Sequence, residues 1–238
     1  GGDGTDTVVL VGETNEASLS GVEVVVGSAG DDSVTVSTND IEAISGGEGF
    51  DDVTLTDASG NTVDLAGVEV ITGSAGDDTL TVTDDTSVMV DGGDGADTLT
   101  GNAGDDTLLG GSGSDTLIGG GGADVVDGGQ DDDLLELDGS AGVTAEGGDG
   151  TDTVVLVGET NEASLSGVEV VTGSAGDDSV TVSTNDIASV SGGSGIDDVT
   201  LTDASGNTVD LAGVEVIAGS AGDDILTVTD DTSVTVKM

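Results

Sequence analysis

Hydrophobic residues recur at every ninth position in the middle of the chain. From residue 92 to residue 136, five consecutive nine-residue words can be written: GGDGADTLT, GNAGDDTLL, GGSGSDTLI, GGGGADVVD and GGQDDDLLE. The eighth residue of each word is aliphatic, in turn Leu99, Leu108, Leu117, Val126 and Leu135. In an extended chain this residue points to one face and its two neighbours point to the other. Each word therefore predicts a glycine-rich turn followed by a three-residue strand with one buried side chain.

Two such words make one complete coil, with two strands and two turns. If successive coils stack, their strands pair in parallel about 4.8 Å apart around an interior one side chain wide. An interior this narrow suits aliphatic residues, and the chain has one Phe and no Trp or Tyr. The pattern predicts an all-β fold, a parallel β-solenoid.

A second, longer repeat contains the first. A shift of 146 residues superimposes residues 1–90 on residues 147–236, with differences at nine positions. Long-period duplication is typical of arrays in which each module packs on its neighbour. We expect three parts, 1–90, 91–146 and 147–238, in one continuous solenoid; separate small β-domains between short rolls are the alternative.

Charge adds a requirement for cations. The formal net charge is −49 and Lys237 is the only Lys or Arg, so internal salt bridges cannot neutralise the carboxylates. Nucleic acid is excluded as a partner, because phosphate binding needs clustered basic residues. No apolar run approaches the roughly 18 residues of a membrane span, and we expect no membrane insertion. Acidic composition alone favours disorder, but the strict order of residues argues for a fold.

The nine-residue words resemble the GGxGxDxUx repeat of the repeats-in-toxin (RTX) family. The resemblance implies a right-handed parallel β-roll, about 18 residues per coil, with Ca²⁺ held in the turns by the sixth-position Asp and by backbone carbonyls. Independently, Ca²⁺ prefers 6–8 oxygen ligands, which acidic and glycine-rich turns can supply. The resemblance also implies type I secretion and an extracellular location, at a bacterial cell surface.

The candidate metal ligands are the sixth residues of complete words and of looser hexads such as GSAGDD. They are Asp6, Asp32, Asp51, Asp78, Asp97, Asp106, Asp115, Asp124, Asp133, Asp152, Asp178, Asp197 and Asp224. Outside the words, adjacent candidates are separated by close to one coil, as Asp32 and Asp51 are, or by close to one and a half coils. The spacing therefore predicts seven same-edge pairs and about seven Ca²⁺ sites: Asp32–Asp51, Asp78–Asp97, Asp97–Asp115, Asp115–Asp133, Asp133–Asp152, Asp106–Asp124 and Asp178–Asp197. Asp6 and Asp224 lack a same-edge aspartate.

Some words depart from the pattern. GSAGDD has Ser and Ala at positions two and three, and GGQDDD lacks the fourth Gly. Long stretches such as residues 8–30 and 53–76 keep the strand-like alternation of apolar and polar residues but lack the turns expected to bind metal. We expect these departures to weaken individual sites more than the fold, and these stretches to continue the solenoid with metal-free corners.

Other chemistry is poorly supported. No segment has both the spacing and the helices of an EF-hand, and Gly119 to Gly122 lack the Lys-Ser/Thr of a phosphate loop. Paired carboxylates here have no aromatic sugar cleft, and without His or Cys there is no catalytic triad. The seventh residue is threonine in the first three words (Thr98, Thr107 and Thr116) but not in the last two (Val125 and Leu134). This interrupted row argues against an ice-binding face. We expect no enzyme activity.

The leading hypothesis is a calcium-binding structural module of a secreted or cell-surface bacterial protein, of the adhesin-stalk, filament, sheath or surface-layer type. It would fold on Ca²⁺ outside the cell, with neighbouring copies as partners through end-to-end or lateral assembly. The alternative is a C-terminal RTX folding and secretion domain of an enzyme or toxin. A weaker third hypothesis is an acidic matrix that binds mineral surfaces.

Overall fold

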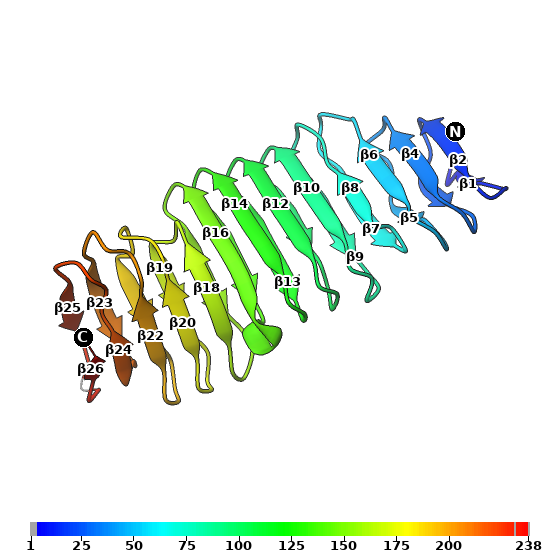
Figure 1. Ribbon diagram of the computed structural model, residues 1–238. Helices are drawn as coiled ribbons and strands as arrows, with labels where there is room; N and C mark the ends of the chain where they lie inside the picture. The colour runs from blue at the N-terminus through cyan, green and yellow to red at the C-terminus, as the bar shows by residue number, and fades with distance from the viewer. Residues whose placement is uncertain (1–3, 231, 238) are drawn as a thin grey trace.

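The protein is a rod built from two parallel β-sheets (Figure 1). The computed structural model describes residues 4–230 and 232–237, and in that part of the chain each sheet has 13 strands. The chain enters one sheet, turns, enters the other and turns again, so odd-numbered strands form the first sheet and even-numbered strands the second. This is the parallel β-solenoid that the nine-residue words predict.

The strands are short. The first sheet contains β1 (Thr7–Val9), β3 (Val24–Val26), β5 (Ala43–Ser45), β7 (Thr62–Ala66), β9 (Thr79–Val82), β11 (Thr98–Thr100), β13 (Thr116–Gly120), β15 (Leu134–Leu137), β17 (Thr153–Leu156), β19 (Val170–Thr172), β21 (Ser189–Ser191), β23 (Thr208–Ala212) and β25 (Ile225–Val228). The second contains β2 (Asn15–Leu19), β4 (Asp32–Val36), β6 (Asp52–Leu55), β8 (Val70–Thr72), β10 (Met89–Asp94), β12 (Thr107–Ser112), β14 (Val125–Gln130), β16 (Val143–Asp149), β18 (Glu162–Ser166), β20 (Ser179–Val182), β22 (Asp198–Leu201), β24 (Val216–Ala218) and β26 (Thr235–Lys237). A single-turn 3-10 helix, η1 (Gly139–Ala141), interrupts one corner.

The register of the sheets confirms a coil of two words where the words are complete. Thr98 pairs with Thr116 in the first sheet, and Thr107 pairs with Val125 in the second. Elsewhere the spacing changes while the pairing persists: Val24 pairs with Ala43, one position beyond a coil of two words. Both sheets run through residues 8–30 and 53–76 without a break, so these stretches continue the solenoid, as expected. Other coils are one position shorter than two words, as where Thr7 pairs with Val24, and the turns accommodate both kinds of difference.

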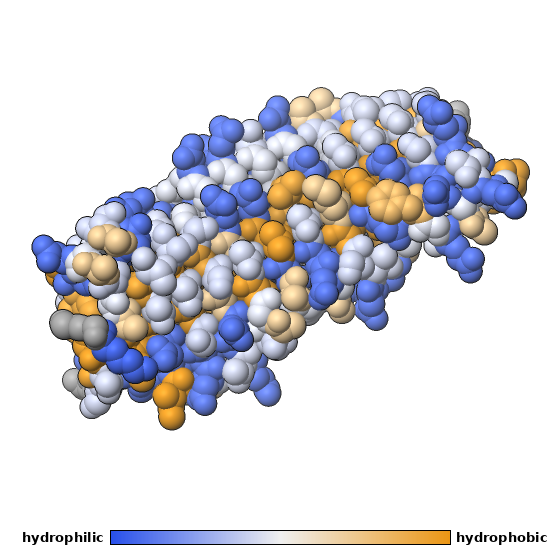
Figure 2. Space-filling model, in the orientation of Figure 1, coloured by the Kyte–Doolittle hydropathy of each residue, from blue (hydrophilic) through white to orange (hydrophobic). Residues whose placement is uncertain are grey.

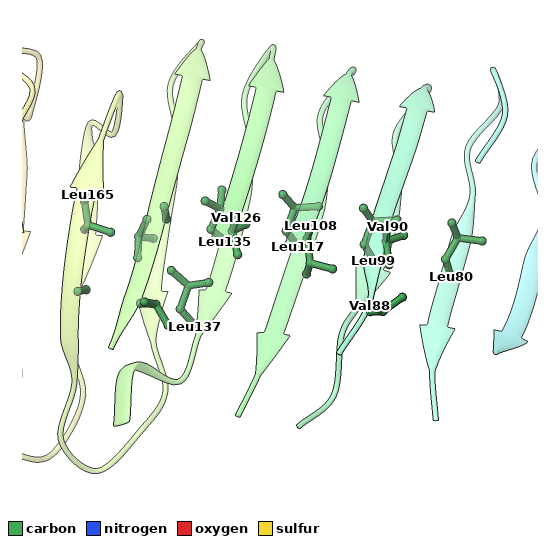
Figure 3. Close-up of a cluster of buried hydrophobic side chains, with 14 of the residues drawn as sticks. Leu80, Val88, Val90, Leu99, Leu108, Leu117, Val126, Leu135, Leu137 and Leu165 are labelled. Carbon is green, nitrogen blue, oxygen red and sulfur yellow. The ribbon is translucent and has the colours of Figure 1, made fainter. Parts of the chain in front are cut away.

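Aliphatic side chains from both sheets, one or two from most strands, fill the space between the sheets (Figure 3). Leu80, Leu99 and Leu117 come from the first sheet, Val90 and Leu108 come from the second, and all five are fully buried. Burial of such a side chain contributes about 1.5–3 kcal/mol. Because strand residues alternate between faces, the neighbours of each core residue point outward. Figure 2 shows hydrophilic side chains along this face of the rod, with hydrophobic ones among them.

The two edges of the rod are not equivalent, which the sequence did not predict. In the first sheet β11 has three residues, as the words predict, and β13 has five, whereas β10, β12 and β14 in the second sheet have six. These strands continue through the glycine pair that follows the core residue, and Gly93 pairs with Gly111. Glycines that lie this close across neighbouring coils extend the ladder into the turn.

In the described part of the chain, no helix has the length and apolar character needed to cross a membrane.

The turns require glycine at specific positions, which generates the first prediction. Gly111 has a φ of 111°, and a Cβ added there would meet the backbone carbonyl of Gly93 in the preceding coil. Gly121 has open space around its Cα. We expect Gly111→Ala to lower the free energy of unfolding by at least about 1–3 kcal/mol, the cost of a strained backbone. Gly121→Ala is the control, and urea unfolding in Ca²⁺ measures both; equal effects would contradict the close stacking of turns.

Candidate metal sites

The predicted aspartates lie in the turns that lead into the strands, at the two edges of the rod. Eleven of them are buried, with 0–3% of each residue exposed: Asp32, Asp51, Asp78, Asp97, Asp106, Asp115, Asp124, Asp133, Asp152, Asp178 and Asp197. Asp6 and Asp224, in the end coils, are partly exposed. Residues 1–3 of the first hexad, GGDGTD, lie outside the described residues, so only its later part can be placed. Burial of so many carboxylates requires compensation.

The structure brings together every aspartate pair that the spacing predicts. In each pair the backbone N–H of the earlier residue donates to Oδ1 of the later one, one coil further along. The N···O distances are 2.7–3.0 Å for Asp32–Asp51, Asp78–Asp97, Asp97–Asp115, Asp115–Asp133, Asp133–Asp152, Asp106–Asp124 and Asp178–Asp197. Along each edge these bonds form a directional ladder of stacked carboxylates. That these residues hold metal ions stays a prediction.

Three ladders begin with Asn and end with Glu, which the sequence reasoning missed, whereas the Asp106–Asp124 ladder begins at Val88, whose N–H donates to Asp106 at 2.9 Å. Asn61 donates its backbone N–H to Asp78 at 2.6 Å, and Asp152 donates to Glu169 at 2.7 Å. Two shorter ladders have the same ends, Asn15 to Glu69 and Asn161 to Glu215. The backbone N–H of Asp6 likewise donates to Glu23, and the backbone N–H of Asn207 donates to Asp224. The only sequence signal was that these Asn and Glu residues recur about one coil away from an aspartate.

The second carboxylate oxygen of many ladder residues has no partner. Among the described residues, Oδ2 is buried and without a hydrogen bond at Asp51, Asp97, Asp106, Asp115, Asp124, Asp133, Asp152 and Asp197. A buried acceptor without a partner costs about 1–3 kcal/mol, and more when it is charged. Eight such oxygens lie at equivalent positions, where a cation would offset the cost of their burial, and carboxylate oxygen is the ligand that Ca²⁺ prefers.

Side chains alone do not complete a coordination shell. Within residues 4–230 and 232–237, no group of three or more His, Cys, Asp or Glu side chains is arranged to hold a metal ion. The carboxylates meet in successive pairs instead. A Ca²⁺ ion bound there would need backbone carbonyls of the glycine-rich turns, or water, for its remaining ligands. This donor set agrees with the one that the RTX resemblance implies.

Burial and stacking change the acidity of these groups. Burial raises the pKa of Asp115 to about 7; the N–H of Asp97 opposes the shift, and the charges of Asp97 and Asp133 add to it. Burial likewise raises the pKa values of Asp97, Asp106 and Asp133 to about 6. Without a cation, several ladder carboxyls are thus partly protonated near neutral pH.

The comparisons with known proteins agree with this geometry. Residues 65–85, 89–117, 100–135, 109–143 and 211–231 match the family described as RTX calcium-binding nonapeptide repeat (4 copies). The matches cover the complete words and parts of the looser hexads on either side. No curated protein and no solved structure matches the chain.

The raised pKa values predict how the metal-free fold responds to pH. A carboxyl with a pKa of 3.8 in the unfolded chain and about 6–7 in the fold stabilises the fold fully below pH 3.8, and this contribution is lost as pH rises through 6–7. In EGTA, we therefore expect the free energy of unfolding to fall between about pH 4 and pH 8. Urea unfolding followed by circular dichroism measures it from pH 4 up to the pH at which the metal-free chain no longer folds.

Asp115→Asn serves as the control, because an amide does not titrate and should reduce the slope. A metal-free stability that increases with pH would contradict the buried, stacked arrangement of the carboxyls.

Proposed function

We propose that this chain, which carries RTX calcium-binding nonapeptide repeats, is a structural module whose solenoid folds and stiffens when Ca²⁺ enters its turns. The observation that carries the proposal is the set of buried Oδ2 atoms without hydrogen bonds, at eight equivalent turn positions among the described residues. These atoms belong to carboxylates stacked one coil apart, where a divalent cation offsets both the desolvation and the mutual repulsion.

Metal binding and folding are coupled in this proposal. At a net charge of −49 with one basic residue, the unfolded chain repels itself. The unfolded chain does not hold the stacked turns, so the free energy of Ca²⁺ binding becomes free energy of folding. The module would stay unfolded at low intracellular Ca²⁺ and fold at the millimolar levels found outside cells.

We place this module in a secreted or cell-surface bacterial protein, as part of a stalk, filament or surface layer. Three features support a mechanical role over a catalytic one. The rod is elongated (Figure 1), the 146-residue unit recurs with nine differences over the 90 residues compared, and each coil contacts its neighbours through strand pairing. A duplicated rod of this kind spans distance, which is what a stalk or fibre needs.

Stacking on a further coil, of a following repeat or of a neighbouring copy, is part of the proposal. Val82 and Val90 are 3% and 0% exposed, because the following coil covers them. The equivalent residues of the second repeat, Val228 and Val236, are 42% and 48% exposed at the end of the rod. Another coil with the same aliphatic core residues would bury these side chains and pair with the strand edges of β25 and β26.

Calcium-dependent folding is the direct test. We expect the β signal in circular dichroism to be lost in EGTA at pH 7.5 and restored by Ca²⁺. Asp115→Asn should raise the Ca²⁺ concentration at half-folding by ~10-fold or more, a typical cost of disturbing a metal site, because Asp115 belongs to two stacked pairs.

Asp31→Asn is the matched control. Asp31 lies on the exposed side of a turn, where its Oδ1 accepts the N–H of Phe50 at 3.0 Å. Its substitution should leave the midpoint nearly unchanged. A β signal indifferent to metal removal would refute the proposed function.

Self-association tests the stacking of copies. In Ca²⁺, sedimentation velocity should show concentration-dependent association of the chain, and the double substitution Val228→Asp with Val236→Asp should abolish it by placing charges on the end face. Val9→Asp with Val11→Asp, near the other end of the rod, provides the complementary variant. A chain that stays monomeric at all concentrations would exclude end-to-end assembly.

A further inference from the structure

Two turns that differ at one residue hold their aspartates differently. Residues 101–106 read GNAGDD and residues 73–78 read GSAGDD. In the first turn, Oδ2 of Asp106 is buried without a hydrogen-bond partner. In the second, Oδ2 of Asp78 accepts the backbone N–H of Ser74 at 2.7 Å and its hydroxyl at 3.0 Å. The second residue of the hexad therefore decides whether this oxygen is available.

Backbone conformation explains the difference. Asn102 has a φ of 81°, and Gly111, which occupies the same hexad position, has a φ of 111°. Asn and Gly adopt positive φ readily, whereas Ser does so rarely. Asn102 and Asp131 are the only non-glycine residues with positive φ in the described chain. Ser74 takes the ordinary conformation, in which its N–H faces the carboxylate of its own turn.

An asparagine in the preceding coil supplies further hydrogen bonds. The amide Nδ2 of Asn61 donates to Oδ1 of Asp78 at 2.7 Å, and the backbone N–H of Asn61 donates to the same oxygen. What remains in this turn is the neutral amide oxygen of Asn61, which is buried without a hydrogen-bond partner. Both carboxylate oxygens of Asp78 are thus engaged by protein donors.

Throughout the described chain, the residue at position two of a hexad correlates with the hydrogen bonds that its last aspartate accepts. All four GSAGDD turns have the Ser and Asn donors on their last aspartate, which is Asp32, Asp78, Asp178 or Asp224. The eight turns with an unpartnered Oδ2 all have Gly or Asn with positive φ at position two, namely Gly47, Gly93, Asn102, Gly111, Gly120, Gly129, Gly148 and Gly193. We call the first kind closed turns and the second kind open turns.

We propose that the residue at position two selects which turns take a Ca²⁺ ion: open turns bind it, and the hydrogen bonds of Ser and Asn occupy closed turns in its place. The inference rests on the calcium binding proposed above and narrows it. Asp32, Asp78, Asp178 and Asp224 are then hydrogen-bonded structural residues and not metal ligands. Six of the eight open turns end between Asp97 and Asp152, so calcium binding is concentrated in the middle of the rod.

The pKa shifts of Asp124 and Asp32 illustrate the same difference between an open and a closed turn. Burial raises the pKa of Asp124, in an open turn. At Asp32, in a closed turn, burial also acts to raise the pKa, but hydrogen bonds from Asn15 and Ser28 outweigh it and the pKa is lowered. The carboxylate of Asp32 therefore stays ionised without a cation, and hydrogen bonds from Asn207 and Ser220 likewise lower the pKa of Asp224.

Exchanging the position-two residues tests the proposal. The number of Ca²⁺ ions per chain is measured by native mass spectrometry at saturating Ca²⁺, for the 238-residue chain and for Asn102→Ser and Ser74→Asn. We expect Asn102→Ser to bind one ion fewer and Ser74→Asn to bind one ion more. Asn102→Gly and Ala103→Ser are controls: glycine preserves positive φ, and Ala103 is an exposed residue of the same turn, so both should bind as many ions as the unmodified chain.

The outcomes distinguish this inference from the proposed function. An unchanged ion count in both Asn102→Ser and Ser74→Asn would overturn the role of position two, even if the unmodified chain binds Ca²⁺. An unmodified chain that binds no Ca²⁺ would overturn the proposed function itself. Should Asn102→Ser not fold in Ca²⁺, Ser74→Asn and Ser74→Gly decide the matter, because neither introduces strain; no gained ion in either would refute the proposal.

Discussion

The fold depends on how buried carboxylates are compensated at the two edges of the rod. Each ladder aspartate accepts one backbone N–H from the coil before it, as Asp115 does from Asp97. That bond aligns the coils but leaves a second oxygen and a negative charge to be balanced. Charges one coil apart repel each other strongly in a medium of low dielectric. Either a cation or hydrogen-bond donors such as Ser74 and Asn61 must compensate for this buried oxygen and its charge.

The narrow interior makes this compensation decisive. Most strands bury only one or two aliphatic side chains, as β11 buries Leu99 alone and β4 buries Val34 and Val36, so each coil removes little apolar surface from water. A globular domain of similar length packs several layers of side chains around one core. Here the contribution of apolar burial grows only with the number of coils, so the turns carry an unusually large share of the cohesion.

The sequence predicted the rod and the stacked aspartates because both follow from spacing. One coil, with or without an extra residue in its turns, returns the chain to the same edge, which places Asp97 beside Asp115 and Asp32 beside Asp51. The ends of the ladders were missed because Asn61 and Glu169 belong to no nine-residue word. The effect of Ser74 could not be predicted from spacing, since it depends on a backbone angle. GSAGDD was visible as a departure, but its consequence required atomic contacts.

The order of the strands has a mechanical consequence. The ends of the described chain lie at opposite ends of the rod (Figure 1), and each strand pairs with those of the adjacent coils. Tension applied between the termini would peel coils away one at a time from the ends, and would not break all the pairings together. Each released coil of two words would add about 60 Å of extended chain. Under load, such a rod would lengthen in steps and dissipate energy gradually.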